Sequence, residues 1–394
     1  MIYTKIEWND LCAVIRLGSF IPENGVAEFH VIIELSSCFE NAEKQYRLLS
    51  EAVHRLMLSP ELKETTLVWK RFFVSDAVNH APYLTRSACE AVSVVQQPPL
   101  NGAKASVWLY FADGVQLSFD TEDETLMMKR PHYAHFFHTQ LHERSADSSN
   151  RSPLTPYPLP IEHQTGVIFN RYNQSLSRHG CTLQRNCLRT WIFVQDVDVQ
   201  YAGMVDSRRE FFERQGLTSQ THYIASTGIE GRYIHSDVLV LMDAYAVAGV
   251  EPEQIKYLKA PTHLNPTHEY GVTFERGVSV DYGDRRHIFI SGTASINHRG
   301  EIVFPLDIEK QTAHTFENVQ ALLNEAGATI NDVAHLIVYL RDTADFIVVN
   351  HYLEQHYPRI PRVLALAPVC RPGWLVEVEC MAVKMIENKQ FAAF

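Results

Sequence analysis

Two carboxyl groups near the end of the chain stand at a spacing suited to proton transfer. Glu377 and Glu379 alternate with Val376 and Val378. Because successive side chains of a strand point to opposite faces, both carboxyl groups are expected on one face and both valines on the other. In a strand with one wet face, such glutamates are simply solvated. In a buried strand, desolvation and neighbouring negative charge raise one pKa, so that a neutral glutamic acid remains as a proton donor. We favour the buried interpretation.

A guanidinium group stands fifteen residues before the first of these glutamates. Arg362 follows Pro361 at the start of an apolar stretch. A guanidinium offers a planar fork that matches a carboxylate, so Arg362 is a candidate for binding an anionic substrate. The alternative is a surface arginine that follows a proline.

The elements that would position these groups recur three times. Each copy consists of an amphipathic helix, an apolar strand that ends in hydrophobic-x-Asp, and a second helix. The strand ends of the three copies are Phe73-Val74-Ser75-Asp76, Phe193-Val194-Gln195-Asp196 and Tyr339-Leu340-Arg341-Asp342. Repeated units bury their apolar faces against one another, so three copies predict an α+β protein that assembles as a trimer within one chain. For each aspartate, helix capping is favoured over chemistry. In the other two copies, Ser106 to Leu109 and Val238 to Leu241 occupy the region of the glutamates, so only the third copy carries an acid.

Periodicity predicts the helices and strands of each copy. The predicted helix faces contain Tyr46, Leu49, Val53 and Leu56; Ile168, Phe169, Tyr172 and Leu176; Met204, Arg208, Phe211 and Phe212; Phe316, Val319, Leu322 and Leu323; and Phe346, Val349 and Leu353. The predicted strands cover 69–74, 105–111, 190–194, 238–242, 287–291, 336–340, 362–367 and 375–381.

A segment rich in serine and proline, residues 145–160, predicts a linker or an extended crossover. We therefore expect three domains: residues 1–145, 146–260 and 261–394.

Composition excludes several classes of protein. The 394 residues are 46% hydrophobic and 21% charged, as in ordinary globular proteins. The net charge of −11 disfavours binding to nucleic acid. Seven scattered cysteines without a CxxC pair argue against disulfides and against a zinc site. We find no apolar run of the roughly 20 residues that a membrane span needs and no secretory signal, so we expect a cytoplasmic protein without a membrane partner.

The third copy resembles the YjgF/Rid family, whose members are trimers of chorismate-mutase-like α+β subunits with active sites between subunits. The matching motifs are Phe289-Ile290-Ser291-Gly292, Asn350, Pro361-Arg362 and Val376-Glu377-Val378-Glu379. In that family the arginine binds a substrate carboxylate and the first glutamate handles a proton or water. The resemblance therefore implies these roles for Arg362 and Glu377. Leu364 and Phe274 depart from the deaminating members, which carry a cysteine and an aromatic hydroxyl there.

Residues 186–385 resemble the chorismatases, which look like Rid domains fused in one chain. The motifs are Ser226-Thr227-Gly228-Ile229, Glu269-Tyr270-Gly271, Gly292-Thr293-Ala294-Ser295 and Cys370, seven residues before Glu377. The resemblance implies cleavage of chorismate, an anionic small molecule, without a cofactor or a metal. It also implies that the substrate-binding residues are Arg362, Gly292, Thr293, Ala294, Thr227, Gly228, Tyr270 and Cys370.

Residue chemistry supports some of these roles and leaves alternatives. Backbone N–H groups at Gly292, Thr293 and Ala294 can approach a ligand, although the same residues also suit a bulge between packed sheets. The hydroxyl of Tyr270 can bind a carboxylate or the ring can simply pack. Cys370 can steer the product or be an inert buried thiol.

The expected reaction begins when Glu377 protonates the enolpyruvyl methylene group, after which water or a ring hydroxyl attacks and pyruvate leaves. The ring product is 3-hydroxybenzoate or a dihydroxycyclohexadiene carboxylate. Cys370 resembles the residue of chorismatases that form the aromatic product, whereas Ala294 resembles the residue of those that hydrolyse chorismate. We favour 3-hydroxybenzoate. Two alternatives remain: a Rid-type enamine or imine deaminase, and a metabolite-binding protein without turnover. In each case a monomer with internal pseudo-threefold symmetry is expected.

Overall fold

The strands of the chain form three sheets of six strands each, as a computed structural model that describes residues 1–23, 25–36, 40–84, 89–144 and 157–394 shows. The strand orders are β1-β2-β3-β6-β4-β5, β11-β10-β12-β9-β8-β7 and β13-β14-β15-β18-β16-β17. In each sheet one parallel pair, β4 with β5, β10 with β11 or β16 with β17, is connected through a helix. The prediction of three tandem α+β units in one chain is therefore confirmed.

The bounds of the elements follow the chain. The first unit contains β1 (Ile2–Trp8), β2 (Ala13–Phe20), β3 (Glu28–Leu35), α1 (Ala42–Met57), β4 (Thr65–Val74), α2 (Ala77–His80), β5 (Ala91–Gln96) and β6 (Ala105–Asp113). The second contains β7 (Gln116–Asp120), β8 (Thr125–Lys129), β9 (Ala134–His142), α3 (Ile161–Arg178), α4 (Leu183–Asn186), β10 (Cys187–Val194), α5 (Val197–Arg214), β11 (Ala225–Glu230) and β12 (Val240–Ala248). The third contains β13 (Ile255–Leu258), β14 (Gly277–Asp281), β15 (Arg285–Ala294), α6 (Ile308–Glu325), β16 (Val333–Leu340), α7 (Phe346–His356), β17 (Arg362–Leu366) and β18 (Val376–Met385).

The predicted helix faces are the faces that the helices bury. Every apolar residue predicted for α3 and α6 is buried, and in α1 only Val53 of the predicted face is half-buried. Both α5 and α6 end just before a glycine with positive φ, Gly216 and Gly327, because glycine adopts this conformation without steric cost.

Two of the three landmark aspartates cap a helix, as predicted. Asp76 accepts a hydrogen bond from the backbone N of Asn79 at 3.0 Å, and Asp342 accepts one from Ala344 at 2.9 Å. Asp196 differs: its φ of 53° places it in the left-handed region, and its side chain makes no capping bond. The Asp196 carboxylate instead forms an ion pair with Arg232 at 2.5 Å.

The chain passes from one sheet to the next at positions that differ from the expected domain boundaries. Strands β7 to β9 precede the expected boundary at residue 145 but belong to the second sheet, in which β9 pairs with β12. Strand β13 precedes the boundary at 260 but belongs to the third sheet. We therefore propose boundaries near residues 114 and 250. Most of the expected linker, residues 145–156, lies outside the described residues.

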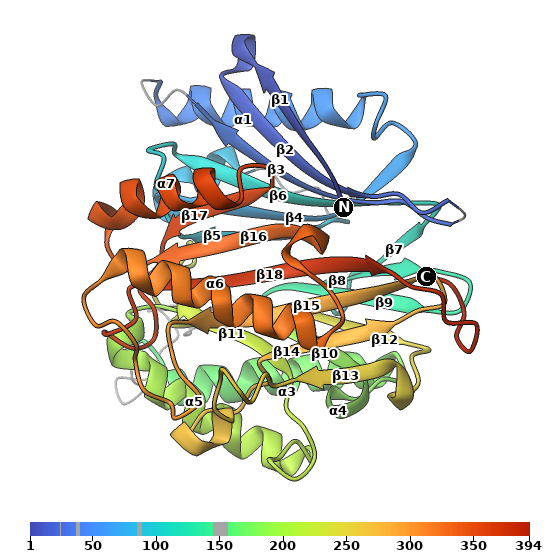
Figure 1. Ribbon diagram of the computed structural model, residues 1–394, viewed down its shortest axis with the longest axis vertical. Helices are drawn as coiled ribbons and strands as arrows, with labels where there is room; N and C mark the ends of the chain where they lie inside the picture. The colour runs from blue at the N-terminus through green and yellow to red at the C-terminus, as the bar shows by residue number, and fades with distance from the viewer. Residues whose placement is uncertain (24, 37–39, 85–88, 145–156) are drawn as a thin grey trace.

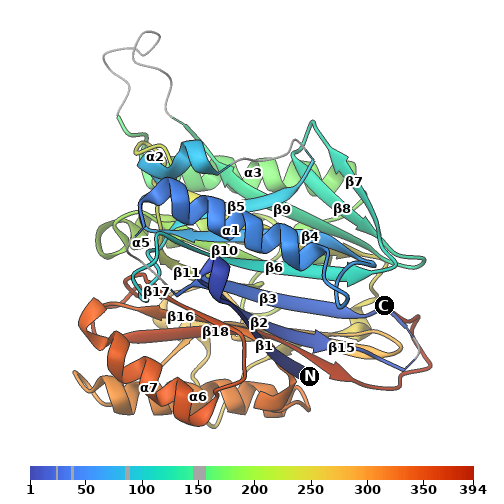
Figure 2. The same cartoon turned by 90° about the horizontal axis from the view of Figure 1, so that it is seen from above.

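The three units close a ring through backbone hydrogen bonds between neighbours. Gln96 N donates to Arg232 O (2.9 Å), Glu230 N to Pro368 O (3.2 Å) and Leu366 N to Pro98 O (2.8 Å). Each of these bonds lies next to the edge strand of a parallel pair, so the same contact recurs between each pair of neighbouring units. Figures 1 and 2 show the sheets together in the middle, with the long helices on the outside.

Aromatic side chains from the three units meet where the sheets face one another. The ring centroids of Trp69 and Trp191 are 5.6 Å apart, those of Trp108 and Trp191 6.3 Å, and those of Tyr245 and Phe289 5.4 Å. Among the described residues, we find no helix that combines the length and apolarity needed to cross a membrane.

Candidate functional site

A pocket lies between the second and third units, where β11 approaches β15 and β18. About 490 Å³ of space in it is free of protein atoms, part of it open to solvent. The lining residues are Tyr201, Arg208, Ser226, Thr227, Gly228, Tyr270, Val272, Phe274, Arg276, Gly292, Ala294, Ile296, Cys370, Arg371, Trp374 and Glu377. The structure thus gathers most of the predicted site: Glu377, Thr227, Gly228, Tyr270, Gly292, Ala294 and Cys370.

Glu377 lies on β18 with 4% of its surface exposed. Its pKa is raised to about 8, chiefly because burial desolvates the carboxyl group and also because Glu379 is negative, while Arg189 and Arg276 act in the opposite direction. Near neutral pH the group is therefore mostly a neutral acid. Of the lining residues that the structure describes, Glu377 is the only acidic one.

Gly292 leaves the space that the Glu377 carboxyl group occupies. A Cβ on Gly292 would lie 2.1 Å from Glu377 Oε1 and 3.1 Å from Thr227 Cγ2. The backbone N of Gly292 donates to Thr227 Oγ1 at 2.9 Å, across the boundary between the two units. A glycine here therefore allows β15 to approach both the acid and the second unit.

Three arginines provide positive charge around this acid. Arg208 is 1% exposed, its Nε donates to Thr273 Oγ1 at 3.0 Å, and its Nη2 has no hydrogen-bond partner in the part of the chain that the structure describes. Arg276 and Arg371 lie over the ring of Tyr270, at 5.3 and 5.0 Å from its centroid. Buried guanidinium groups with free donors favour an anionic ligand.

The thiol of Cys370 is not a nucleophile in this environment. Burial raises its pKa to about 12, with a further contribution from the charge of Glu377 and an opposing one from a hydrogen bond with Tyr201. Burial also raises the pKa of Tyr201 well above its usual value. Both groups are therefore neutral, and they can contact a ligand as a thiol and a hydroxyl.

Thr293 lies beside the pocket without lining it. Its hydroxyl donates to the backbone O of Ser291 at 2.9 Å and is fully buried. Its neighbours Gly292 and Ala294 do line the pocket.

Arg362 does not meet Glu377, contrary to the prediction. On β16, Leu336 pairs with Arg362 and Tyr339 pairs with Glu377. Positions 336 and 339 differ by an odd number, so the two side chains lie on opposite faces of the sheet. The guanidinium of Arg362 forms an ion pair with Glu354 on α7 and donates to Tyr357 O at 2.9 Å.

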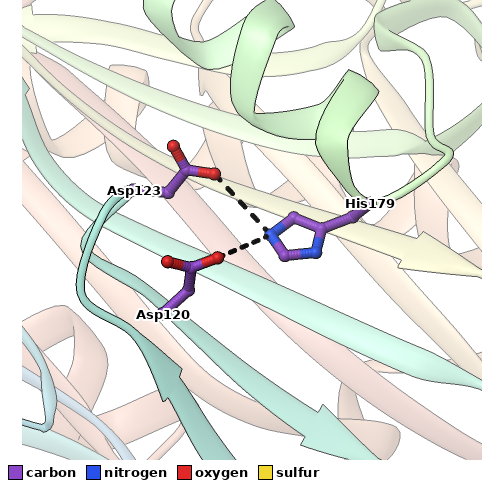
Figure 3. Close-up of side chains that lie close together, drawn as sticks. All are labelled: Asp120, Asp123 and His179. Atoms are coloured by element: carbon purple, nitrogen blue, oxygen red, sulfur yellow. Dashed lines mark ion pairs between the residues drawn. The ribbon is translucent and has the colours of Figure 1, made fainter.

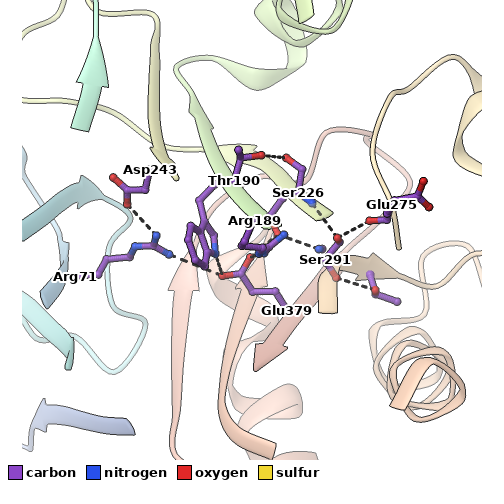
Figure 4. A network of polar contacts seen from close by, with 12 residues as sticks. Arg71, Arg189, Thr190, Ser226, Asp243, Glu275, Ser291 and Glu379 are labelled. Atoms are coloured by element: carbon purple, nitrogen blue, oxygen red, sulfur yellow. Dashed lines mark hydrogen bonds and ion pairs between the residues drawn. The ribbon is translucent and has the colours of Figure 1, made fainter. Parts of the chain in front are cut away.

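Glu379 shares a face with Glu377 but is not free to bind a ligand. Its carboxylate accepts hydrogen bonds from Arg189 Nη2 (2.6 Å), from Trp191 Nε1 (2.9 Å) and from the hydroxyl of Thr227. Figure 4 shows this network in the interior, with Arg71 and Asp243 beside it. The predicted same-face pair thus consists of one acid at the pocket and one carboxylate in a buried ion pair.

One other cluster contains potential metal ligands. Among the described residues, Asp120, Asp123 and His179 form the one group of such side chains close enough to share an ion (Figure 3). His179 Nε2 lies 3.7 Å from Asp120 and 3.8 Å from Asp123. Arg178 Nε already donates to Asp123 at 2.8 Å, and its cation competes with any metal. We assign no metal to this cluster.

Comparisons with known proteins agree with the fold. The family profile described as Endoribonuclease L-PSP matches residues 277–384. A RutC family protein of Pyrococcus abyssi is 37% identical over 100 residues, which are 25% of this chain and 78% of the relative. The 3-aminoacrylate deaminase RutC of Acinetobacter baylyi is 27% identical over 97 residues, 24% of this chain and 77% of the relative. A crystal structure of a chorismatase superposes with a TM-score of 0.61 at 19% identity, covering 82% of this chain and 95% of that one.

The chain belongs to the RutC family, within the YjgF/Rid superfamily. The likeness to the chorismatase structure covers 82% of this chain and, at 19% identity, establishes the shared fold.

Several pocket residues carry no functional signal in the sequence. The sequence pattern indicates Arg208 only as part of a helix face. Tyr201 precedes it by two helical turns on the same helix, a spacing that places both on one side of α5. Arg276, Arg371 and Trp374 come from segments without periodicity, so no sequence signal indicates where their side chains lie.

Proposed function

We propose that the protein cleaves chorismate to pyruvate and a ring product, with Glu377 as the acid. The single observation that carries this proposal is a neutral carboxylic acid, with a pKa of about 8, beside three arginines in one pocket. Chorismate is a dianion with an enol ether, so its cleavage needs cations for two carboxylates and a proton for the enol carbon. The fold shared with a chorismatase supports the same assignment.

In the proposed mechanism, Glu377 transfers its proton to the terminal methylene carbon of the enolpyruvyl group. Positive charge then develops at the ether carbon, and water or a ring hydroxyl attacks. After attack by water, the bond between the ether carbon and the ring oxygen breaks, so pyruvate separates from a ring alcohol. After attack by the neighbouring ring hydroxyl, the bond from the ether carbon to the original ether oxygen breaks and so does the bond from the ring to the hydroxyl oxygen, which leaves as the carbonyl oxygen of pyruvate. The ring keeps the ether oxygen, and the hydrogen on the carbon that bears it is lost as the ring becomes aromatic and the oxygen becomes a phenol. The proton lost by the water or by the hydroxyl returns to Glu377. Attack by water adds one water and gives a dihydroxycyclohexadiene carboxylate, whereas 3-hydroxybenzoate and pyruvate together account for all atoms of chorismate. We propose 3-hydroxybenzoate as the ring product.

The arginines of the pocket replace Arg362 as candidates for binding the carboxylates. Arg208 offers an unpartnered Nη2 and Arg276 an unpartnered Nε, both counted within the described part of the chain. The aromatic rings of Tyr270, Phe274 and Trp374 provide an apolar wall for the ring of the substrate. We also propose that the protein acts as a monomer in the cytoplasm, because the three units already close a ring within one chain.

The direct test is incubation of the purified protein with chorismate. Pyruvate release, followed through lactate dehydrogenase, is expected, and mass spectrometry identifies the ring product. No pyruvate under conditions in which the protein is folded would contradict the proposal. The name of the matching family profile refers to a ribonuclease, but the net charge of −11 disfavours RNA as the substrate.

A second candidate is an enamine or imine deaminase that acts on a small carboxylic acid. The relative named 3-aminoacrylate deaminase favours it, at 27% identity. Release of ammonia from such a substrate, without pyruvate from chorismate, would support the deaminase. Tight binding of chorismate with neither product would support a binding protein.

The pH dependence of kcat follows from the raised pKa of Glu377. The reactive form is the neutral acid, which predominates below the pKa of about 8 and is lost above it. We therefore expect kcat to be level below about pH 7 and to fall roughly tenfold per pH unit well above pH 8. A kcat that increases through pH 8 would show that the group acts as a base.

A methyl group at position 292 is expected to displace the acid. In the Gly292→Ala variant the new Cβ would overlap Glu377 Oε1, so the carboxyl group must rotate away from the pocket. We expect kcat to fall about tenfold, since displacements near 1 Å are enough for such losses. Gly180→Ala is the control for a glycine replacement, because nothing lies within 4 Å of a Cβ there. Because Gly180 has a φ of 69°, an alanine there strains the backbone but does not touch the pocket, so this variant shows the effect of a strained glycine replacement alone. Equal kcat values in both variants would contradict the prediction.

A further inference from the structure

Arg71 of the N-terminal unit is a charged side chain that lies near the pocket without lining it. Of the described residues, none from β1 to β6 lines the pocket. Arg71 on β4 is nevertheless fully buried where the three units meet, and its Nη2 donates to Asp243 Oδ2 of the second unit at 2.8 Å. Its Nη1 lies 3.9 Å from Glu379 Oε1 of the third unit. Arg71 therefore links all three units, as Figure 4 shows.

The surroundings of Arg71 leave its charge poorly hydrated. Its guanidinium carbon lies 4.5 Å from the ring centroid of Trp191 and 5.4 Å from those of Trp69 and Trp108. Its Nε and Nη1 have no hydrogen-bond partner within the described residues. A buried cation of this kind is stabilised mainly by the negative charges next to it, here Asp243 and Glu379.

A short series of contacts connects Glu379 with the acid. The hydroxyl of Thr227 donates to Glu379 and accepts a hydrogen bond from the backbone N of Gly292 at 2.9 Å. Gly292 in turn borders the carboxyl group of Glu377. Glu379 also lies two residues from Glu377 on the same face of β18.

The charges of this interior cluster balance. Arg71 and Arg189 are positive, and Asp243 and Glu379 are negative, with direct ion pairs between Arg71 and Asp243 and between Arg189 and Glu379. Loss of Arg71 would leave one net negative charge in a buried region next to Glu377. At the short distances and low dielectric of an interior, one charge has a large effect.

We propose that Arg71 is a positioning residue, through which the N-terminal unit sets the charge and the geometry of Glu379, Thr227 and Gly292 around the acid. This inference rests on the proposed role of Glu377 as the proton donor. It gives the N-terminal unit a part in the reaction although none of its described residues lines the pocket.

Other groups face Glu377 and remain unchanged in the test. Arg189 and Arg276 lower its pKa, and Arg208 and Arg371 line the same pocket. The hydroxyl groups of Tyr201, Tyr270 and Tyr339 and the thiol of Cys370 also face it, and burial raises the pKa of each so that they are neutral.

The test compares kcat for chorismate against pH in three variants. In Arg71→Met we expect kcat to fall about tenfold with KM within twofold of wild type, and the alkaline limb to move up by roughly one pH unit. Glu379→Gln should move the limb down, because a charge that raises the pKa of Glu377 is lost. Arg71→Lys, which keeps the charge, should restore the limb to the wild-type pH.

An alkaline limb that stays in place in Arg71→Met would overturn the inference, whatever Glu379→Gln does, because a merely structural role changes the yield of folded protein and not the pH profile. If Arg71→Met does not fold, the double variant Arg71→Met with Asp243→Asn removes a balanced pair. It should fold and keep the wild-type limb, and a shifted limb in it would also overturn the inference.

An infrared measurement separates this inference from the proposed function. The band of a protonated carboxyl group, present in wild type and absent in Glu377→Gln, should titrate near pH 8 without any substrate. In Arg71→Met the band should titrate at higher pH. If chorismate is not cleaved but the band shifts as stated, the proposed function fails and the coupling of Arg71 to Glu377 holds. An unchanged band in Arg71→Met would refute the coupling, whatever the activity.

Discussion

The Glu377→Gln variant is expected to release pyruvate from chorismate roughly 10²- to 10⁴-fold more slowly than the wild-type protein. An amide is nearly the same size as the carboxyl group but has no acidic proton, so the substitution removes the proton transfer alone. Because Glu377 is buried and largely neutral, the neutral glutamine should fit its site without loss of stability. The measurement is kcat at pH 7 by the coupled pyruvate assay, together with the midpoint of thermal unfolding.

Glu387→Gln is the matched control, since Glu387 is exposed and follows the same strand. It should keep the wild-type kcat. If Glu377→Gln retained most of its activity, the proton would come from another group. If chorismate bound to both proteins with equal affinity and neither turned it over, the protein would be a binder.

The Arg208→Met variant is expected to increase KM for chorismate by about 10- to 100-fold, with a smaller effect on kcat. A hydrogen bond to a charged group contributes about 1.5–3 kcal/mol, and each 1.4 kcal/mol corresponds to about a factor of ten in affinity. Arg208 is 1% exposed and offers an unpartnered Nη2, counting only described residues, so its loss removes a donor that is already in place. Methionine preserves much of the apolar stem.

Arg214→Met, on the exposed side of the same helix, is the control for this variant and should leave KM unchanged. Equal KM values for Arg208→Met and wild type would mean that the substrate carboxylates bind elsewhere. In that case Arg276 and Arg371, the other two cations of the pocket, become the candidates.

Local sequence patterns were sufficient for much of the third unit. The heptad-like spacing of Phe316, Val319 and Leu323 and the continuous apolar run of 336–340 each correspond to one buried helix face or strand. The repeated hydrophobic-x-Asp motif correctly indicated three units, because each copy ends the strand that pairs in parallel with the next. Strands β1 to β3 and β7 to β9 were not predicted, although most of their pairings join strands that follow one another in the sequence. Of these strands, β3 and β9 also pair with a distant strand, β6 and β12, and a contact of that kind leaves no local pattern.

The acid of the site was also predictable, because it depends on alternation within one strand. Glu377 and Glu379 do share the inner face of β18. The sequence could not show which carboxyl group is neutral, because that depends on Arg189, Trp191 and Thr227 from the second unit, which pair with Glu379 and not with Glu377.

The partners of the acid were decided by the assembly of the units. Arg362 and Glu377 both belong to the third unit, but the pocket that Glu377 lines lies between the second and third units. When the second and third units are aligned on Phe193 and Tyr339, Ser226 on β11 is the equivalent of Arg362 on β17. Ser226 lines the pocket. The sequence by itself therefore determined the repeated units and the acid, since both follow from periodicities within one element. Only the tertiary structure decided that Arg208, Arg276 and Arg371 surround this acid, because the contacts between units join segments that no local pattern relates.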